Sequence, residues 1–322
     1  MNTLTPNPTR TQMRLPERAR KYVHASKAPN TITAYKRALR DFEYYCRAVA
    51  HAPALPASTE TVCEYIAYLA DGRAKVSTID QRIAAIAYAH TAQNLNDPTA
   101  HAMIRETMAG IRRAIGTAPN QKAPLLRADV RHLALVCGDD LRGLRDAALI
   151  LLAFAGAFRE SELTALEVRD LKYTADELLI TVRKSKTDQE REGRIKRIPI
   201  LSDASAAFCP VRALQAYLTA AEISSGPVFR KIDRWSKVWD RAMRPAAVAY
   251  ILKRACNLAG LDASEIAGHS PRAGFVTQAA QDGIALHEIQ DVTWHKSSDM
   301  VRRYIRNQGI SGQKTIRRVL EG

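Results

Sequence analysis

Three short stretches of the chain combine arginine, histidine and tyrosine in a way that suits attack on a phosphodiester. Arg159 lies in the segment GAFRESEL, and His269 and Arg272 form an H-x-x-R motif. His295 is followed nine residues later by Tyr304. The arginines and a histidine can hold the negative charge that develops on a phosphate, and the tyrosine can be the nucleophile. This set of groups needs no metal ion.

A basic hairpin is predicted between the first arginine and the H-x-x-R motif. Residues 177–183 and 195–200 are rich in β-forming residues and are joined by a polar, charged turn. The hairpin is either a solvated basic surface or a finger laid on a nucleic-acid backbone, with one lysine at the reacting atom. Its basic residues are Lys184, Lys186, Arg191, Arg194, Lys196 and Arg197.

Helices are predicted to hold the rest of this constellation. Arg159 opens a short helix that runs to about Val168. Ser270 and Pro271 suit an N-cap and first helical position, so Arg272 projects from a helix N-terminus, where backbone N–H groups favour an anion. The apolar run 147–158 is too short to span a bilayer and is predicted to be a buried core helix. Further helical patterns cover 127–137, 143–155, the chain from Pro210 onward, and 246–259.

The first 120 residues contain no catalytic constellation and predict four helices with apolar residues near the 3.6-residue period. The predicted helix starts are Asn30-Thr31, Ser58, Ser77 and Pro98-Thr99. His90 lies on an apolar side, which favours a packed, hydrogen-bonded core histidine over a ligand. This part of the chain is predicted to be a binding module.

The charge of the chain favours an anionic partner that touches both halves. The 322 residues carry a net charge of +15, and the isoelectric point is about 9.8. Residues 1–120 have 16 Lys and Arg against 9 Asp and Glu, which leaves a net +8 for the remainder. The predicted organisation is a flexible segment at 1–29, a helical domain at 30–116, a proline-containing linker at 117–125 and a catalytic domain at 126–322.

The cysteines and the N-terminus indicate a reducing compartment. The five cysteines form no CxxC pair, which argues against a zinc cluster or a disulfide framework. The N-terminus has no apolar segment of the kind that directs secretion. We therefore expect a cytoplasmic protein, associated with the bacterial nucleoid, that needs no metal or other cofactor and contacts no membrane.

Taken together, the motifs resemble the tyrosine recombinases of the phage integrase family over nearly the full chain. The resemblance rests on G-x-x-R-x-S-E-L at 156–163, Ser-Lys-Thr at 185–187, H-x-x-R at 269–272 and H-x₈-Y at 295–304. Each motif alone is weak, but the four in this order form a specific pattern. Residues 77–90 and 97–113 also resemble the core-binding domain of Cre-like members. The implied fold is mainly helical with a small β-sheet: a four-helix, SAM-like core-binding domain followed by an α+β catalytic domain.

The resemblance implies a role for each residue of the set. Tyr304 would attack the scissile phosphate and form a 3′-phosphotyrosyl bond, and His269 would accept its proton. Lys186 would protonate the leaving 5′-oxygen. Arg159 and Arg272 would hold the non-bridging oxygens of the phosphate. His295 would donate a hydrogen bond to the same phosphate, and Glu162 would orient the site.

Several assignments have competitors. Lys184 competes with Lys186, although Ser-Lys-Thr is the family's pattern. The family's usual Leu-Gly-His is here Thr293-Trp294-His295; some relatives use tryptophan at the histidine position, but the nine-residue spacing selects His295 and makes Trp294 a packing residue. Outside the motif, Arg159 would be a salt-bridged surface arginine, Tyr304 a packed aromatic and His269 a cap of the helix that it precedes.

Three function classes remain open on sequence alone. The first is a site-specific recombinase that acts on double-stranded DNA with short inverted repeats. It would work as a synaptic tetramer and form a Holliday junction, and an accessory protein or a partner recombinase is a further candidate partner. The second is a type IB topoisomerase, and the third a DNA-binding protein without catalysis. The amphipathic tail at 305–322 favours the first, because it can dock in a neighbouring protomer; otherwise it packs on its own domain. About 30 residues precede the first helix, which favours a recombinase without an arm-binding domain.

Overall fold

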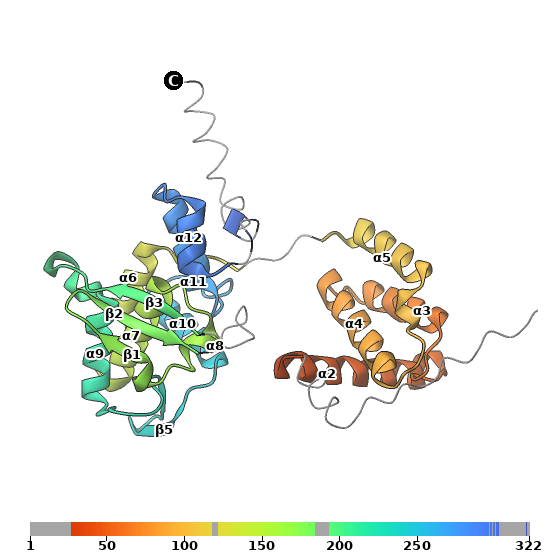
Figure 1. Cartoon of the computed structure of the whole chain (residues 1–322), viewed down its shortest axis with the longest axis horizontal. Helices are drawn as coiled ribbons and strands as arrows, with labels where there is room; N and C mark the ends of the chain where they lie inside the picture. The colour runs from red at the N-terminus through yellow and green to blue at the C-terminus, as the bar shows by residue number, and fades with distance from the viewer. Residues whose placement is uncertain are drawn as a thin grey trace, which may run out of the picture. The chain divides into compact units, whose positions relative to one another are not determined.

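The computed structural model describes residues 27–117, 122–183 and 193–295, with the single positions 297, 299, 301, 302 and 320. The chain folds into two compact units, Met1–Asn120 and Gln121–Gly322 (Figure 1). Helices dominate both units and the strands form small antiparallel sheets, so the predicted fold class is confirmed. Among the helices of the described ranges, none is long and apolar enough to cross a membrane.

In the described part of the first unit, residues 27–117, four α-helices surround one apolar core. Phe42 and Tyr45 from the first helix pack against the ring of Tyr65, with ring centroids 4.9 and 5.0 Å apart. His90 is fully buried: its Nε2 accepts from the Ala57 N–H at 2.9 Å and its Nδ1 lies 2.8 Å from the Ile86 carbonyl. The prediction of a hydrogen-bonded core histidine is therefore confirmed. The helices are α2 (Pro29–Tyr45), α3 (Thr59–Asp71), α4 (Val76–Ala92) and α5 (Ala102–Ile115).

Only one of the four predicted helix starts in this unit is confirmed. Ser58 caps α3, and its hydroxyl accepts from the Thr61 N–H at 3.1 Å. Helix α2 starts at Pro29 rather than after it, because proline suits the first helical position. Helix α4 starts at Val76, so Ser77 lies inside the helix and is not its cap.

The predicted start at Pro98-Thr99 is wrong by one turn. Asp97 accepts a hydrogen bond from the Thr99 N–H at 2.9 Å, and this local bond holds Pro98–Ala100 in a short 3₁₀ helix. Helix α5 then begins at Ala102, with His101 as its N-cap.

The second unit is organised around α7 (Leu141–Ala155), which packs against α6 (Arg127–Leu135) and α9 (Pro210–Ala220). Asp140 caps α7 by accepting from the Gly143 N–H at 2.6 Å. Residues 148–153 of α7 are all buried, as predicted for the apolar run. The other α-helices with described bounds between residues 122 and 295 are α8 (Glu160–Leu163), α10 (Ala246–Leu258), α11 (Ser270–Gln281) and α12 (Leu286–Thr293).

A three-stranded antiparallel sheet lies against this helical core (Figure 1). Its strands are β1 (Leu171–Tyr173), β2 (Glu177–Val182) and β3 (Arg194–Pro199), in that order. The predicted β2–β3 hairpin is confirmed, with Ile180 opposite Lys196; β1 was not expected. Lys184 and Lys186 belong to the turn at 184–192, which lies outside the described residues.

A second hairpin, β4 (Arg230–Ile232) and β5 (Val238–Ala242), was also not expected. The predicted helix after Arg159 ends at Leu163, earlier than the expected Val168. Helix α11 begins at Ser270, so His269 rather than Ser270 occupies the N-cap position, and its side chain makes no capping hydrogen bond. The Ser270 hydroxyl instead accepts from the Ala267 N–H at 3.0 Å.

Residues 122–125 belong to the second unit and are hydrogen-bonded to its other segments. The Ala123 N–H donates to the Glu265 carbonyl at 2.8 Å, and the Leu125 N–H donates to the Ser270 carbonyl at 3.1 Å. Leu125 is buried in the core of that unit. Residues 1–26 of the expected flexible segment at 1–29 lie outside the described residues.

Candidate active site

Arg159 is held by Glu162 at the start of α8. One carboxylate oxygen of Glu162 accepts from the Arg159 backbone N–H at 3.0 Å, and the other accepts from Arg159 Nη1 at 2.5 Å. The Glu162 side chain is buried, and a buried carboxylate is stable only when it is paired or hydrogen-bonded. Glu162 therefore fixes both the helix start and the direction of the Arg159 guanidinium.

Arg272, in the first turn of α11, is only 2% exposed and is anchored by carbonyl groups from two other segments. Its Nη1 donates to the Ala157 carbonyl at 2.6 Å, and its Nη2 donates to the Thr293 carbonyl. Ala157 has a positive φ of 44°, which turns the chain sharply at the end of α7. The planar fork of arginine suits this two-sided anchoring, which a lysine could not reproduce.

His295 follows α12 and contacts Arg272. Its Nε2 lies 3.2 Å from Arg272 Nη2, and its Nδ1 lies 2.7 Å from the Thr293 hydroxyl. Arginine only donates, so Nε2 must accept from Arg272 and the ring hydrogen lies on Nδ1. Thr293 is able to accept that hydrogen because its own hydroxyl donates to the Ile289 carbonyl at 2.7 Å.

The environment of His295 disfavours the charged imidazole. Burial, and after it the positive charges of Arg272, Arg159 and Lys196, lowers the pKa of His295 to about 4. His295 is therefore neutral near pH 7 in the absence of DNA.

Lys196, on β3, also belongs to this site, although the sequence did not single it out. It is 4% exposed, and its Nζ donates to the Val292 carbonyl at 2.7 Å, near the end of α12. The ammonium also lies 3.9 Å from the centroid of the Trp294 ring. Burial, and after it the charge of Arg272, lowers the pKa of Lys196 to about 7, while Glu162 opposes this shift.

The alternation of buried and exposed side chains along β3 indicates that Lys196 is buried. Ile198 is buried on the same strand and lies two residues away, so Lys196 must face inward as well. Trp294 packs against the core of the second unit and ends α12 with a positive φ of 56°. This position agrees with the packing role expected for Trp294.

Gly268 brings the segment before α11 against α8. A Cβ atom at Gly268 would lie 1.4 Å from a carboxylate oxygen of Glu160, so no other residue fits there without displacing that side chain. His269 follows directly and is exposed. This close approach fixes the H-x-x-R segment beside the segment that carries Arg159.

The structure thus brings Arg159, Glu162, Arg272 and His295 into one electrostatically coupled site, with Lys196 added. Two fixed guanidinium groups beside a neutral imidazole are suited to hold a phosphate. Lys186, its competitor Lys184, Tyr304 and most of the tail at 305–322 lie outside the described residues. Their assignments remain predictions.

Known proteins share both the sequence pattern and the fold. Residues 125–309 match the phage integrase family. An integrase/recombinase xerD homolog of Selenomonas ruminantium is 40% identical over 310 residues, which cover 95% of this chain and 90% of the relative. The chain therefore belongs to the phage integrase family.

Two solved structures of DNA-bound recombinases share the fold. XerH site-specific recombinase bound to its palindromic difH substrate gives a TM-score of 0.65, with 16% identity, over 90% of this chain and 78% of that chain. A lambda integrase dimer bound to a COC′ core site gives 0.61, with 15% identity, over 91% of this chain and 76% of that chain. At these identities, the likeness shows the fold alone.

Proposed function

We propose that this chain is a tyrosine-type site-specific DNA recombinase that cuts and rejoins strands of duplex DNA through a covalent tyrosyl intermediate. The observation that carries the proposal is the coupled pair of Arg159 and Arg272, each fixed by buried partners in a catalytic unit of the phage integrase family. The recombinase relative, 40% identical over nearly the whole chain, supports the same activity.

The first chemical step transfers a strand to the protein. The Tyr304 oxygen attacks the scissile phosphorus, and its proton passes to His269, since a tyrosine with a pKa near 10 must lose it on attack. The bond from phosphorus to the 5′-oxygen breaks, and Lys186 supplies the proton that this oxygen gains. Arg159 and Arg272 hold the non-bridging oxygens.

The second step restores the DNA backbone. The 5′-hydroxyl of the partner strand attacks the phosphotyrosine, and the tyrosine regains a proton. One phosphoester bond forms for each that breaks, so the exchange consumes no ATP, and the fixed cationic side chains supply the charge that a metal ion supplies in other enzymes.

The bonding of His295 sets a condition on its role. With the hydrogen on Nδ1, Nε2 accepts from Arg272 and has nothing to donate to a phosphate. A phosphate bound beside Arg272 places negative charge near the ring and favours its protonated form. His295 thus becomes a donor to the phosphate when DNA binds.

The assembly that we propose is a tetramer on two duplexes, each with short inverted repeats, in which the tail at 305–322 docks on a neighbouring protomer. The solved structure of a lambda integrase dimer on a core site supports assembly of this fold on DNA. An accessory protein or partner recombinase, and a role in a mobile element, are further parts of this proposal. In this proposal, recombination takes place in the cytoplasm, where the DNA lies.

A type IB topoisomerase would share the cleavage chemistry but would relax supercoils as a monomer. The integrase/recombinase relative of Selenomonas ruminantium favours strand exchange. The test begins with selection of bound sites from a random-sequence duplex library. A plasmid that carries two copies of the selected site is then incubated with the protein: recombined products support the proposal, and relaxation without any exchange supports the topoisomerase.

A further inference from the structure

The turn that leads from α12 to His295 passes through a backbone conformation that its residue does not favour. Trp294 ends the helix with a φ of 56° and a ψ of 40°, and its N–H donates to the Gln290 carbonyl at 2.7 Å. This left-handed conformation suits glycine at the end of a helix, whereas a residue with a Cβ atom and a large ring is strained there. Contacts of the Trp294 side chain must therefore offset the strain.

One ammonium group contacts this turn on both sides of Thr293. Lys196 Nζ donates to the Val292 carbonyl at 2.7 Å and lies 3.9 Å from the centroid of the Trp294 ring. The last carbonyls of a helix have no partner in the helix itself, and Lys196 supplies one to Val292. A cation over the face of an indole ring is attracted by the negative charge of that face. Lys196 thus holds both the backbone and the side chain of the turn.

The same ammonium group reaches the segment that precedes Arg159. Lys196 Nζ lies 5.3 Å from the centroid of the Phe158 ring, and Phe158 is buried in the core of the unit. Because Lys196 itself belongs to β3, its side chain joins segments that are distant in the sequence. These are the hairpin strand, the residue before Arg159 and the residues before His295.

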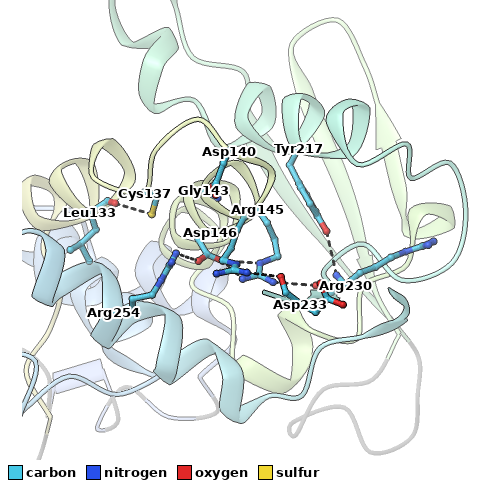
Figure 2. Close-up of polar contacts among 11 residues, drawn as sticks. Leu133, Cys137, Asp140, Gly143, Arg145, Asp146, Tyr217, Arg230, Asp233 and Arg254 are labelled. Atoms are coloured by element: carbon cyan, nitrogen blue, oxygen red, sulfur yellow. Dashed lines mark hydrogen bonds and ion pairs between the residues drawn. The ribbon is translucent and has the colours of Figure 1, made fainter. Parts of the chain in front are cut away.

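Lys196 makes these contacts at a cost in solvation. The side chain is 4% exposed, and within the described ranges its hydrogen-bond acceptor is the Val292 carbonyl and no carboxylate lies at ion-pair distance. Another buried cation of the same unit is neutralised directly: Arg145 forms an ion pair with Asp146 at 2.6 Å (Figure 2). A buried ammonium group without such a partner lowers stability, and proteins tolerate such a cost mainly at functional sites.

The turn that Lys196 contacts holds the phosphate-binding groups together. The Thr293 carbonyl accepts from Arg272 Nη2, and the Thr293 hydroxyl lies 2.7 Å from His295 Nδ1. A rotation of the backbone at 292–294 would therefore move His295 relative to Arg272. Lys196 fixes this backbone to the sheet and so opposes the rotation.

The strand that carries Lys196 also closes the hairpin of the proposed general acid. In the β2–β3 pairing, Val182 lies opposite Arg194, and Lys186 follows Val182 by four residues in the sequence. The base of this hairpin is thus tied, through Lys196, to the turn before His295.

We propose that Lys196 is a positioning residue of the active site. Its hold on the turn at 292–294 fixes His295 relative to Arg272, and its place on β3 keeps the base of the Lys186 hairpin beside them. Lys196 acts through these residues and does not itself contact the phosphate. The inference rests on the proposed function and adds to it a residue outside the motifs.

The first experiment uses Lys196→Met, which keeps the length of the side chain and loses its charge. Single-turnover formation of the covalent adduct is measured on a nicked suicide substrate that carries the selected site. The rate should fall by about 10²-fold, the size expected when a reacting group is misplaced by about 1 Å. The control is Lys172→Met, the same substitution at an exposed position of β1 in the same sheet, and it should cleave at the parent rate. A parent rate in Lys196→Met would overturn the proposal.

Conservative variants separate the proposed contacts from a general loss of folding. Lys196→Arg keeps a donor for the Val292 carbonyl and a cation for the ring, so it should recover part of the rate that Lys196→Met loses. At position 294, Trp294→Tyr and Trp294→Leu share the strain of the left-handed backbone, but only tyrosine keeps a ring face for the ammonium group. Trp294→Tyr should therefore cleave faster than Trp294→Leu. Equal rates for these two variants would contradict the proposed contact.

The salt dependence of binding shows whether Lys196 contacts a phosphate directly. The slope of log affinity against log salt changes by about 0.9 for each phosphate contact that is lost. Lys196→Met should keep the parent slope although it cleaves slowly. A slope that is less negative by about 0.9 would make Lys196 a phosphate contact and overturn its positioning role.

A double-mutant cycle tests whether Lys196 acts through His295. The rate defect of Lys196→Met should be clearly smaller in a His295→Gln background than in the parent, because the group that it positions is already gone. Defects that multiply fully would show independent action and overturn the proposal. If the parent protein itself forms no adduct on any selected site, the proposed function fails instead, so the two failures are distinguishable.

Discussion

Arg272 donates a hydrogen bond to Nε2 of His295, across 3.2 Å, and thereby fixes both the tautomer and the charge of the histidine. Each residue limits what the other can do for a phosphate. Arg272 supplies permanent charge from a buried position, while His295 stays neutral until negative charge arrives. The site is therefore pre-organised around its arginines and responsive at its histidine.

Tyr304→Phe should bind DNA normally but form no covalent adduct, because the phenyl ring has no oxygen to attack phosphorus. The measurement uses a nicked suicide substrate that carries the selected site, followed by a denaturing gel. Tyr304 loses its assignment if the mutant still gives a covalent band.

Cleavage should persist in excess EDTA, since guanidinium and ammonium groups supply the charge at the phosphate. The yield of covalent adduct is compared before and after chelation, with DNA binding measured in parallel. A complete loss of adduct with intact DNA binding would sink the proposed mechanism.

Lys186→Ala should slow cleavage of an ordinary phosphodiester by about 10²–10⁴-fold, the range typical of acid catalysis. A substrate with sulfur at the bridging 5′ position leaves without protonation and should recover most of the rate. Arg159→Ala serves as the control, because its lost charge on the non-bridging oxygens is not restored by a better leaving group. Equal defects of Lys186→Ala on both substrates would make Lys186 a backbone contact and move the acid role to Lys184 or Lys196.

His295 should make stability depend on pH in the acidic range. Its pKa in the folded protein, about 4, lies below the ordinary value of 6.5, so the unfolded chain takes up a proton first as pH falls. The stability of the parent relative to His295→Gln should therefore fall between pH 6.5 and 4, by up to about 1.4 kcal/mol per pH unit. Urea unfolding of both proteins at several pH values measures this, and a constant difference would show that His295 titrates normally.

Lys196 should make stability rise with pH in the same direction, but between neutral and alkaline pH. Its pKa is about 7 in the folded protein and 10.5 ordinarily, so the unfolded chain holds a proton that the folded chain has lost between these values. The parent should gain stability relative to Lys196→Met as pH rises from 7 toward 10.5, by up to about 1.4 kcal/mol per pH unit. Unfolding at pH 7, 8 and 9 tests it. The idea is wrong if the difference between the two proteins does not change.

Sequence reasoning singled out Arg159, Arg272 and His295 because each lies in a short motif and their residue types are unusual as a set. It could not find Lys196, since a basic residue in a basic hairpin looks solvated until its strand neighbour Ile198 is known to be buried. It also missed β4–β5, whose charged residues conceal the short strands. The predicted N-cap at Ser77 was wrong because α4 already begins at Val76. The predicted N-cap at Ser270 was wrong because Ser270 is the first residue of α11 and its hydroxyl bonds to the loop before the helix.

The contact between Gly268 and Glu160 couples two positions that lie far apart in the sequence. Because a Cβ at 268 would occupy the space of the Glu160 side chain, a larger residue at 268 must displace that side chain, and a smaller residue at 160 would relieve the clash. We expect the two positions to co-vary among proteins with this site. Engineering of either arginine-bearing segment must then treat this pair as one steric unit, because a change of side-chain size at one position alters the space available at the other.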